Sequence, residues 1–382
     1  MAKYKLGEIC EIVSGSTPKT GIAEYWDGNL KWITPAEIDD ESYIITDSAR
    51  KLTELGVKKT GLSSFPSGTV ILSSRAPIGK VAIAGCEMYC NQGFKNLICS
   101  DRINNRYLYW FLKGSTAYLN SLGRGATFKE ISKKIVSDIE INVPEISQQL
   151  AAVNALERVS EIIRLRKNQL QKLDELIKAR FIELFGDPMT DVSKWSVSTI
   201  GEQFNVASGG TPATGEKAYW ENGTIPWIGS NMCQDTMLSE NDGKFITEEG
   251  YAHSSTKWFH KGTVLVALVG ATIGKTALLR FDTTTNQNIA AIDVTPNAAF
   301  SSEFVFYHMQ MLYSKFMEIG SGKFKMANQG FIRQLPLICP PMELQEQFAA
   351  FVEQTDKSKV AVQKALDEAQ MLFDSLMQKY FG

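Results

Sequence analysis

Val269–Thr276, VGATIGKT, is the stretch of this sequence that comes nearest to a phosphate-binding loop. Loops of the Gly-x-x-x-x-Gly-Lys-Ser/Thr type need four residues between the two glycines, because the backbone N–H groups of that turn surround the phosphates. Only three residues separate Gly270 from Gly274. The corresponding stretch SRAPIGKV, residues 74–81, shares Ile-Gly-Lys but lacks the first glycine and the final hydroxyl. We therefore expect no nucleotide site in either stretch, and we expect the shared lysines to face an anionic partner.

Residues suited to catalysis or metal binding are scarce elsewhere. Two of the three histidines, His253 and His260, lack carboxylates at metal-ligand spacing. The six cysteines are scattered in apolar surroundings, which is typical of reduced core thiols in a cytosolic protein. There is no Asn-Pro-Pro-aromatic motif of the kind that amino-methyltransferases use, and no Gly-x-Gly-x-x-Gly after a predicted strand. The sequence therefore predicts a chain that is not itself an enzyme and that binds no metal or cofactor of its own.

The composition is that of a globular protein with more than one domain. The chain has 382 residues, of which 44% are hydrophobic and 21% charged. It has no apolar run long enough to span a bilayer, and its first residues contain no signal-peptide pattern, so we expect a cytoplasmic protein without a membrane contact. The formal net charge is −2. A nucleic-acid partner would therefore have to bind local basic patches, or other subunits would have to supply positive charge.

The chain is a tandem duplication. SGSTPKTGIAEYW at 14–26 returns as SGGTPATGEKAYW at 208–220, and CNQGFKNLI at 90–98 returns as TNQNIAAID at 285–293. The stretches around the two Ile-Gly-Lys sequences also correspond, and the simplest alignment sets Arg75 opposite Gly270. Because repeats come in the same order throughout, the whole chain is two copies of one design.

Two corresponding loops are rich in cations and amides. They are GRGATFKEISKK at 123–134 and GSGKFKMANQGF at 320–331. Gln and Asn can bind an adenine edge through two hydrogen bonds, Arg and Lys can bind guanine, and Gly lets the backbone approach phosphates. A solvated turn is the alternative for either loop taken alone. The paired aromatics Tyr25-Trp26 and Tyr219-Trp220 are more typical of core anchors than of base stacking.

Each copy has two parts. The first, of about 140 residues, contains short strand-like runs and one helical stretch, which predicts a mixed α/β domain. The second follows Pro144, or Pro340 and Pro341, and has apolar residues every seven positions, as in a long helix that pairs with another. About forty residues at ~1.5 Å each give a helix of roughly 60 Å. The predicted seam residues are Leu156, Ile163, Leu170, Ile177, Leu184, Val352, Leu366, Phe373 and Tyr380.

The predicted fold class is therefore α+β, with two duplicated α/β domains joined by two long, antiparallel coiled-coil helices in a pseudo-twofold dumbbell. The expected divisions are a first recognition domain at 1–144, a helical spacer at 145–188, a second domain at 189–340 and a second spacer at 341–382.

In this layout the sequence resembles the specificity subunit of type I restriction-modification enzymes. The resemblance covers the full length and rests on the two SG[SG]TP…YW…WI stretches, the Asn-Gln turns at 91–92 and 286–287, and the helix starts VPEISQQ and PPMELQEQ. The last two are similar to the Pro-Pro-Leu-x-Glu-Gln-Gln helix start of this family, although VPEISQQ has one proline and lacks the Glu-Gln pair.

The resemblance implies a non-catalytic chain that reads double-stranded DNA. Each recognition domain of the family reads one half of a split target, and the helices fix the gap and dock two DNA adenine methyltransferase subunits. Restriction subunits join through the complex. S-adenosylmethionine, ATP and magnesium belong to those partner subunits.

On this reading, loop residues of the two copies contact DNA. The predicted contacts are Thr17, Arg75, Lys80, Gln92, Lys95, Arg124, Thr127 and Lys129 in the first copy, and Thr211, Lys275, Gln287, Lys323, Lys325, Asn328 and Gln329 in the second. Two alternatives remain. One is a coiled-coil scaffold that presents two binding modules to ligands other than DNA, and the other is a duplicated nucleotide-using transferase, which the incomplete phosphate loop disfavours.

Overall fold

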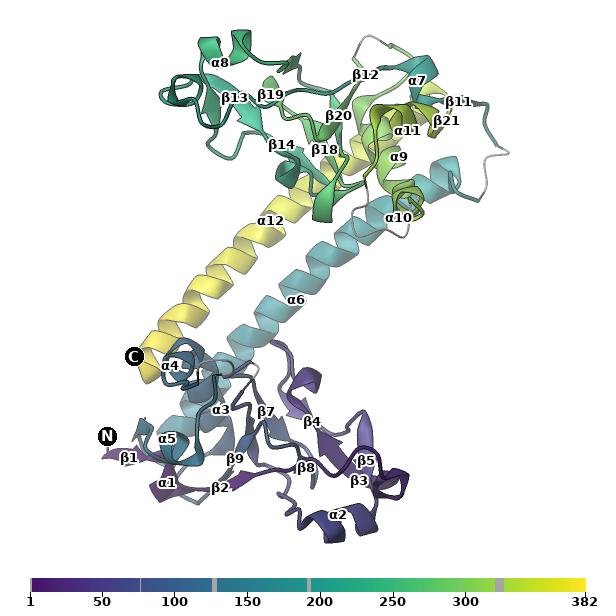
Figure 1. The fold of residues 1–382 in the computed structure, drawn as a ribbon. Helices are drawn as coiled ribbons and strands as arrows, with labels where there is room; N and C mark the ends of the chain where they lie inside the picture. Colours follow the sequence, from purple (N-terminus) through teal and green to yellow (C-terminus); the bar gives the residue numbers. More distant parts are fainter. Residues whose placement is uncertain (1, 76, 126–128, 191–193, 296, 320–325) are drawn as a thin grey trace. The chain divides into compact units, whose positions relative to one another are not determined.

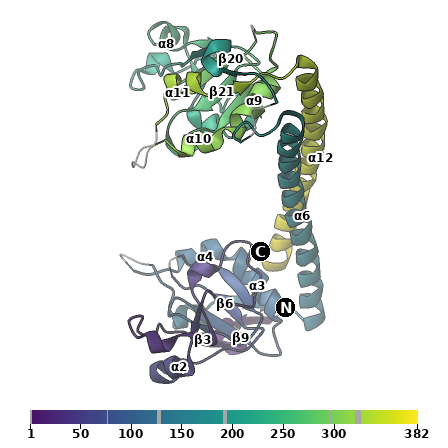
Figure 2. The ribbon, with the colours of Figure 1, turned by 90° about the vertical axis from the view of Figure 1, so that its right-hand side faces the viewer.

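The computed structural model describes residues 2–75, 77–125, 129–190, 194–295, 297–319 and 326–382. Contacts divide the chain into two compact units. Unit 1 contains Met1–Lys167 and Lys364–Gly382, and unit 2 contains Asn168–Gln363. Each unit therefore combines one α/β domain with part of each long helix, and both chain termini belong to unit 1 (Figure 1, Figure 2).

The domain of unit 1 is built on a five-stranded sheet with the strand order β2-β9-β6-β7-β4. A three-stranded sheet, β5-β3-β8, and an antiparallel pair, β1-β10, complete it. Most strands are short and rich in β-branched or aromatic residues, as the sequence predicted. Their bounds are β1 Ala2–Lys5, β2 Cys10–Ser14, β3 Trp26–Ile33, β4 Ile44–Ile45, β5 Arg50–Leu52, β6 Val70–Leu72, β7 Val81–Ala84, β8 Tyr89–Cys90, β9 Lys95–Cys99 and β10 Glu140–Val143.

The domain of unit 2 repeats this topology. Its five-stranded sheet has the order β12-β20-β17-β18-β14, beside a four-stranded sheet β15-β13-β19-β16 and the pair β11-β21. The five-stranded sheets and the two-stranded pairs match strand by strand, and β15-β13-β19 matches β5-β3-β8, whereas β16 has no counterpart among the described strands of unit 1. This match confirms the duplication in three dimensions. The bounds are β11 Val197–Thr199, β12 Asn205–Ala207, β13 Ile225–Ile228, β14 Thr236–Leu238, β15 Phe245–Ile246, β16 Trp258–Phe259, β17 Val264–Ala267, β18 Thr276–Leu279, β19 Thr283–Thr285, β20 Ile289–Asp293 and β21 Pro336–Ile338.

Short helices cover the sheets. In unit 1, α3 contacts β6 and β7 on one side and the long helix α12 on the other, through Trp110 and Phe373 at 5.6 Å between ring centroids (Figure 2). The bounds are α1 Leu6–Ile9, α2 Glu54–Thr60, α3 Asn105–Gly114, α4 Thr116–Ser121, α5 Lys133–Ser137, α7 Ile200–Gln203, α8 Glu248–Ala252, α9 Ser302–Met311, α10 Tyr313–Met317 and α11 Gln329–Gln334. Single 3₁₀ turns are η1 Ala23–Tyr25, η2 Pro35–Glu37, η3 Lys217–Tyr219, η4 Ser230–Met232 and η5 Gly270–Thr272.

The two long helices predicted from the heptad pattern are present. They are α6, Ile146–Phe185, and α12, Met342–Phe381, of forty residues each. Within unit 2 they run antiparallel, since Asp174 forms an ion pair with Lys359 at 2.6 Å while Phe181, further along α6, packs on Phe348, nearer the start of α12. No helix among the described residues is long and apolar enough to cross a membrane.

The seam residues lie on the buried side of both helices. Ile163 packs in unit 1 with Ala369 and its neighbours, and Leu156 enters the core of the unit 1 domain. In unit 2, Ile177 and Val352 belong to the core of the domain, so the helices are fused to it rather than attached by a linker. The other predicted seam residues are half-buried, namely Leu170, Leu184, Leu366, Phe373 and Tyr380.

The shared Ile-Gly-Lys sequence is a hairpin turn. Gly79 and Gly274 have φ values of 95° and 76°, the left-handed region that favours glycine. A Cβ at Gly274 would lie 2.7 Å from Cγ of Phe316 in α10. The glycine is thus required by the backbone and by packing, which explains why both copies keep it without forming a phosphate loop.

Candidate nucleic-acid interface

The duplicated loop and the Asn-Gln turn form one substructure in each unit. In unit 2, Oγ1 of Thr211 donates a hydrogen bond to Oε1 of Gln287 at 2.6 Å. In unit 1, Thr17 makes the same hydrogen bond to Gln92. Both glutamines are exposed at the surface of their unit. The two stretches that carry the sequence repeat therefore meet around a fixed, outward-facing glutamine.

The backbone of the Asn-Gln turn is held in the same way in both copies. The N–H of Asn286 donates to the carbonyl of Ile228 at 3.1 Å, and its Oδ1 accepts from the N–H of Asn288 at 3.0 Å. Asn91 makes the equivalent bonds in unit 1, to Ile33 at 3.1 Å and from Gly93 at 2.9 Å. The asparagine fixes the turn, and the glutamine projects from it.

Glycine brings the duplicated loop close to this turn. A Cβ at Gly209 would lie 2.0 Å from the carbonyl oxygen of Thr285, and one at Gly15 would lie 2.0 Å from that of Cys90. Burial raises the pKa of the Cys90 thiol to about 12, so this side chain is a neutral part of the packing. No side chain other than hydrogen fits at either glycine without moving the loop.

The tryptophans donate hydrogen bonds to the backbone of the duplicated loop and are core anchors, as predicted. Nε1 of Trp227 donates to the carbonyl of Gly210 at 3.0 Å, and Nε1 of Trp32 donates to that of Ser16 at 3.1 Å. Trp227 packs edge-to-face on Trp220, with ring centroids 5.2 Å apart. Trp32 and Trp227 are buried and their N–H groups are satisfied, so these two rings are unavailable for stacking on bases.

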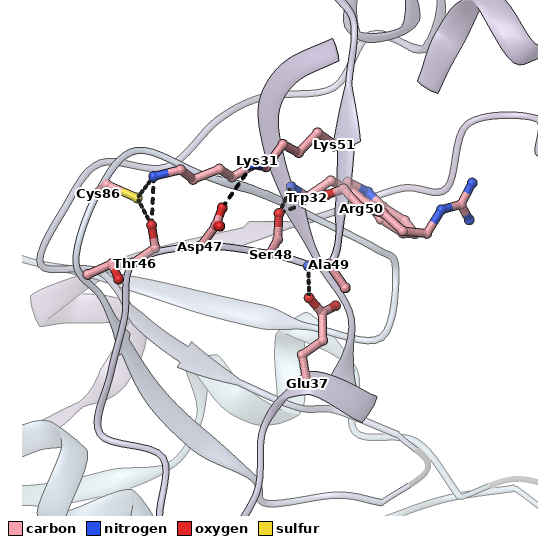
Figure 3. A network of polar contacts seen from close by, with 10 residues as sticks. All are labelled: Lys31, Trp32, Glu37, Thr46, Asp47, Ser48, Ala49, Arg50, Lys51 and Cys86. Atoms are coloured by element: carbon pink, nitrogen blue, oxygen red, sulfur yellow. Dashed lines mark hydrogen bonds and ion pairs between the residues drawn. The ribbon is translucent and has the colours of Figure 1, made fainter. Parts of the chain in front are cut away.

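In unit 1 a polar network fixes the strand that carries Trp32 (Figure 3). Nζ of Lys31 donates to the carbonyl of Thr46 at 2.6 Å, which ties β3 to the segment before β5. Glu37 accepts from the N–H of Ala49 at 2.7 Å on the other side of this segment. The network therefore stabilises the strand from which the tryptophan reaches the duplicated loop.

Arg50, in the same network, covers the tryptophan pair. Its guanidinium carbon lies 3.4 Å from the centroid of a Trp26 ring, a cation–π contact. Nε1 of Trp26 donates in turn to the carbonyl of Lys19 in the duplicated loop, at 3.2 Å. Arg50 pairs with Trp32 across the strands, and in unit 2 the N–H of Trp227 donates to the carbonyl of Lys244 at 3.1 Å, so Lys244 is the counterpart of Arg50. Its Nζ pairs with Asp242 at 2.9 Å.

Beside each exposed glutamine lies a backbone bridge, Arg75 with Glu130 in unit 1 and Val269 with Met326 in unit 2, which we call the lip of that unit. Hydrogen bonds correct the sequence alignment of the two lips. The N–H of Ser74 donates to Gly93 at 2.7 Å, and the N–H of Leu268 donates to Asn288 at 2.9 Å. Ser74 and Leu268 are therefore equivalent. The residue after each one is equivalent too, so Arg75 corresponds to Val269 and not to Gly270 as the sequence alignment suggested.

The residues across from this position also differ. Arg75 forms an antiparallel bridge with Glu130, and Val269 forms the corresponding bridge with Met326. Nζ of Lys95 adds an ion pair to Glu130 at 3.2 Å. The same backbone arrangement thus carries a charged lip in unit 1 and an apolar lip in unit 2.

In unit 2 the lip borders a cavity of about 430 Å³. Three predicted residues, Gln287, Asn328 and Gln329, line it together. The other polar or flexible residues of this cavity were not predicted from the sequence, because nothing in their local pattern distinguishes them from ordinary turn residues. They are Ser208, Ser255, Lys257, Asn288 and Met326.

Three predicted lysines are bound within their own unit. Lys80 donates from Nζ to the carbonyl of Pro35 at 3.1 Å, and Lys275 pairs with Asp235 at 2.5 Å. Lys95 is only 7% exposed and contacts Ser74 as well as Glu130. Their ammonium groups hold loops together.

The remaining predicted residues are placed differently. In unit 1, Thr17, Gln92, Arg124 and Lys129 are exposed, and Arg75 is half-buried. Arg124 joins the charged lip through paired backbone hydrogen bonds with Glu130, at 3.0 and 2.9 Å. Thr127, Lys323 and Lys325 lie outside the described residues. Within the described part of the chain, no group of three or more His, Cys, Asp or Glu side chains could hold a metal ion.

Comparison with known proteins agrees with this architecture. The family model for the type I restriction modification DNA specificity domain matches residues 1–175 and 192–369. The specificity subunit of the type I restriction enzyme MjaIX from Methanocaldococcus jannaschii is 28% identical, over 98% of this chain and 91% of that protein. The EcoR124I/EcoR124II specificity subunit of Escherichia coli is 26% identical over 45% of this chain and 39% of its own length.

Solved structures share the fold. The type I restriction-modification S subunit from M. genitalium aligns with a TM-score of 0.58 and 16% identity, covering 100% of this chain and 96% of its own. A chain from a structural study of complex assembly and conformational transition in the type I restriction-modification system aligns with a TM-score of 0.61 and 19% identity, covering 100% and 97%. The matched family model covers both copies of the duplication. The chain therefore belongs to the type I restriction-modification DNA specificity family, whose members determine which DNA sequence such a system acts on.

Proposed function

We propose that the two α/β domains of this chain each read one half of a bipartite double-stranded DNA target. The observation that carries the proposal is the repeated Thr–Gln pair. In each unit this pair holds one exposed glutamine beside a lip, and the residues of the lip differ between the two units. A shared frame with different contact residues suits a target whose two halves differ in sequence.

The proposed contact residues fall into two groups. Gln92, Arg75, Arg124 and Lys129 contact the first half-site, and Gln287, Asn328 and Gln329 contact the second. Thr17 and Thr211 position the glutamines. Lys80, Lys95 and Lys275 act indirectly, by holding the loops, because their ammonium groups already have partners.

The long helices are proposed to set the gap between the half-sites and to dock two DNA adenine methyltransferase subunits. Residues 145–188 and 341–382 form these spacers, and 1–144 and 189–340 form the recognition domains. A continuous 40-residue helix is stiff, so it can maintain a distance that a flexible linker cannot. The seam residues keep the two helices paired.

The chain itself is proposed to catalyse no reaction. Methyl transfer with S-adenosylmethionine, and ATP- and magnesium-dependent restriction, belong to the partner subunits in the cytoplasm. The formal charge of −2 fits this division, because methyltransferase subunits would supply much of the positive charge that phosphates require.

The test is to co-express the full chain with its methyltransferase partner and map methylated adenines across a genome. We expect one bipartite motif with a fixed gap, which disappears when the chain is omitted. Gln92→Ala and Gln287→Ala should each relax one half of the motif and leave the other unchanged.

A scaffold that binds ligands other than DNA is the second candidate, because heptad helices also occur in scaffolds. It predicts no co-purifying methyltransferase and a methylation pattern that is independent of this chain. Either of these results would reject the DNA-reading function.

A further inference from the structure

We propose that the apolar lip of unit 2, formed by Val269 and Met326, receives the C5-methyl group of a thymine in the half-site that this unit reads. This inference rests on the proposed function and assigns a chemical preference to one of its two surfaces. Among the four unmodified DNA bases, thymine alone presents a methyl group in the major groove.

The lip is built to present apolar atoms outward. Val269 and Met326 pair across an antiparallel bridge, and the next hydrogen bond, from the N–H of Ala327 to the carbonyl of Leu268, is 2.8 Å long. Leu268 and Ala327 are buried at 5% and 4% exposure, so the backbone beneath the lip is fixed. Met326 is 68% exposed. A flexible thioether on a fixed base is suited to close around a small apolar group.

Such exposure of an apolar side chain has no benefit for the folded chain alone. Because Met326 stays largely in water, the chain does not gain the favourable free energy that burying its apolar side chain would provide. Its place on the wall of a cavity lined by both apolar and polar side chains indicates that a partner covers it. The partner must offer an apolar group beside polar ones, because the cavity also contains amide side chains and Lys257.

The polar groups around the lip suit an A·T base pair. Thr211 donates to Oε1 of Gln287, which leaves the two N–H donors of that amide available to a partner. Thymine O4 and adenine N7 are acceptors, and both lie on the same groove edge as the thymine methyl group. Gln329 supplies a second amide on the same cavity, and Lys257 is an exposed cation suited to a neighbouring phosphate.

Unit 1 provides the contrast. Its lip carries Arg75 and Glu130, and Lys95 contacts Glu130 at 3.2 Å. A methyl group set against these charges would displace their water without offering a hydrogen bond. The methyl contact is therefore expected in one half-site only.

The probe is a target duplex in which each thymine is replaced in turn by uracil, which keeps every base-pairing group and lacks only the methyl. Binding is measured for the full chain in complex with its methyltransferase subunits. One uracil position, in the unit 2 half-site, should weaken binding by about three- to tenfold, the effect of one buried methyl group.

In Met326→Ala this position should lose its sensitivity, so that thymine and uracil duplexes bind equally. Uracil positions in the unit 1 half-site serve as the internal control, because they should respond identically in the wild type and the variant. Since Met326 is exposed, the substitution should leave the fold intact, which circular dichroism checks.

A second variant transfers the unit 1 lip to unit 2. Val269→Arg combined with Met326→Glu should abolish the thymine preference at that position and leave the other half-site unchanged.

If a bipartite motif exists but no uracil position loses its effect in Met326→Ala, the methyl contact is wrong and the DNA-reading function stands. If no bipartite motif exists at all, the proposed function itself fails. Retained thymine sensitivity with loss of methyltransferase binding in Met326→Ala would instead make the lip a protein contact.

Discussion

Gln149 joins the first turn of α6 to the loop that precedes α3. Its Oε1 accepts from the N–H of Asn104 at 2.8 Å, and its Nε2 donates to the carbonyls of Arg102 and Pro144 at 3.0 and 2.8 Å. The side chain is completely buried. All three hydrogen bonds of this amide side chain are thus made to backbone groups of the domain that the helix follows.

Gln345 makes the equivalent set of bonds in unit 2. Its Oε1 accepts from Ser301 at 2.9 Å, and its Nε2 donates to Ala299 and Pro340 at 3.0 and 2.9 Å. The helix start VPEISQQ, which departs from the family pattern in sequence, therefore keeps the glutamine that attaches helix to domain. One glutamine per copy sets how each long helix leaves its domain.

Replacing Gln149 by Leu should lower the free energy of unfolding of unit 1 by about 2–4 kcal/mol. The substitution leaves three partly buried backbone groups without this partner. A fully buried unpaired group costs about 1–3 kcal/mol, and water relieves part of that cost at these positions. Urea unfolding followed by circular dichroism measures the change. Gln148→Leu is the matched control, because the adjacent side chain is exposed and should change stability little. Equal effects of both variants would contradict this role.

Thr211→Val should weaken binding to the cognate duplex by about three- to tenfold, since it removes the hydrogen bond that orients Gln287. Thr214→Val, an exposed threonine in the same loop, should have no effect. In a Gln287→Ala background the Thr211 substitution should add nothing further. An additive loss in the double variant would show that the threonine acts on DNA independently of the glutamine.

Lys275 and Lys257 should respond differently to replacement by Met. Lys275 pairs with Asp235, so its loss should lower stability by about 1 kcal/mol, a value limited by partial exposure of the pair. It should leave the salt dependence of DNA binding unchanged. Lys257→Met should leave stability unchanged and reduce the slope of log K against log salt by about one. A reduced slope for Lys275→Met would mean that this lysine leaves Asp235 to contact a phosphate.

The stability of unit 2 should fall as the pH drops from about 6.5 toward 4. His308 is completely buried between aromatic residues, and burial lowers its pKa from 6.5 to about 4, against the opposing effect of its hydrogen bond to Pro336. Between these pH values the unfolded chain binds a proton that the folded chain does not. The contribution is therefore complete above pH 6.5 and declines as the pH falls, by up to about 3 kcal/mol.

His308→Gln isolates this effect, because glutamine can still donate toward Pro336 and does not titrate. Thermal unfolding of both proteins between pH 4 and 7 should give a smaller loss of stability for the variant. Identical pH profiles would show that other groups are responsible.

Much of the fold followed from the sequence because its signals are local or periodic. The repeated SG[SG]TP and Asn-Gln stretches revealed two equivalent copies, and apolar residues every seven positions predicted α6 and α12. The tryptophans were correctly predicted as core anchors, since large aromatics beside a turn are usually buried. These conclusions needed no knowledge of which strand pairs with which.

The candidate interface depended on contacts between residues far apart in the chain. Thr211 meets Gln287 across 76 positions, and Met326 joins Val269 only because strand register brings their segments together. A linear alignment set Arg75 opposite Gly270, whereas hydrogen bonding sets it opposite Val269. A lysine in a loop gives no local sign of whether a carbonyl or carboxylate lies within its reach, so the internal bonds of Lys80, Lys95 and Lys275 could not be foreseen. Two equivalent domains and two long helices are evident from the order of residues alone, because repetition and periodicity are properties of the linear chain. Which side chains those domains present depends on long-range strand register and burial, and these are set only when the chain is folded.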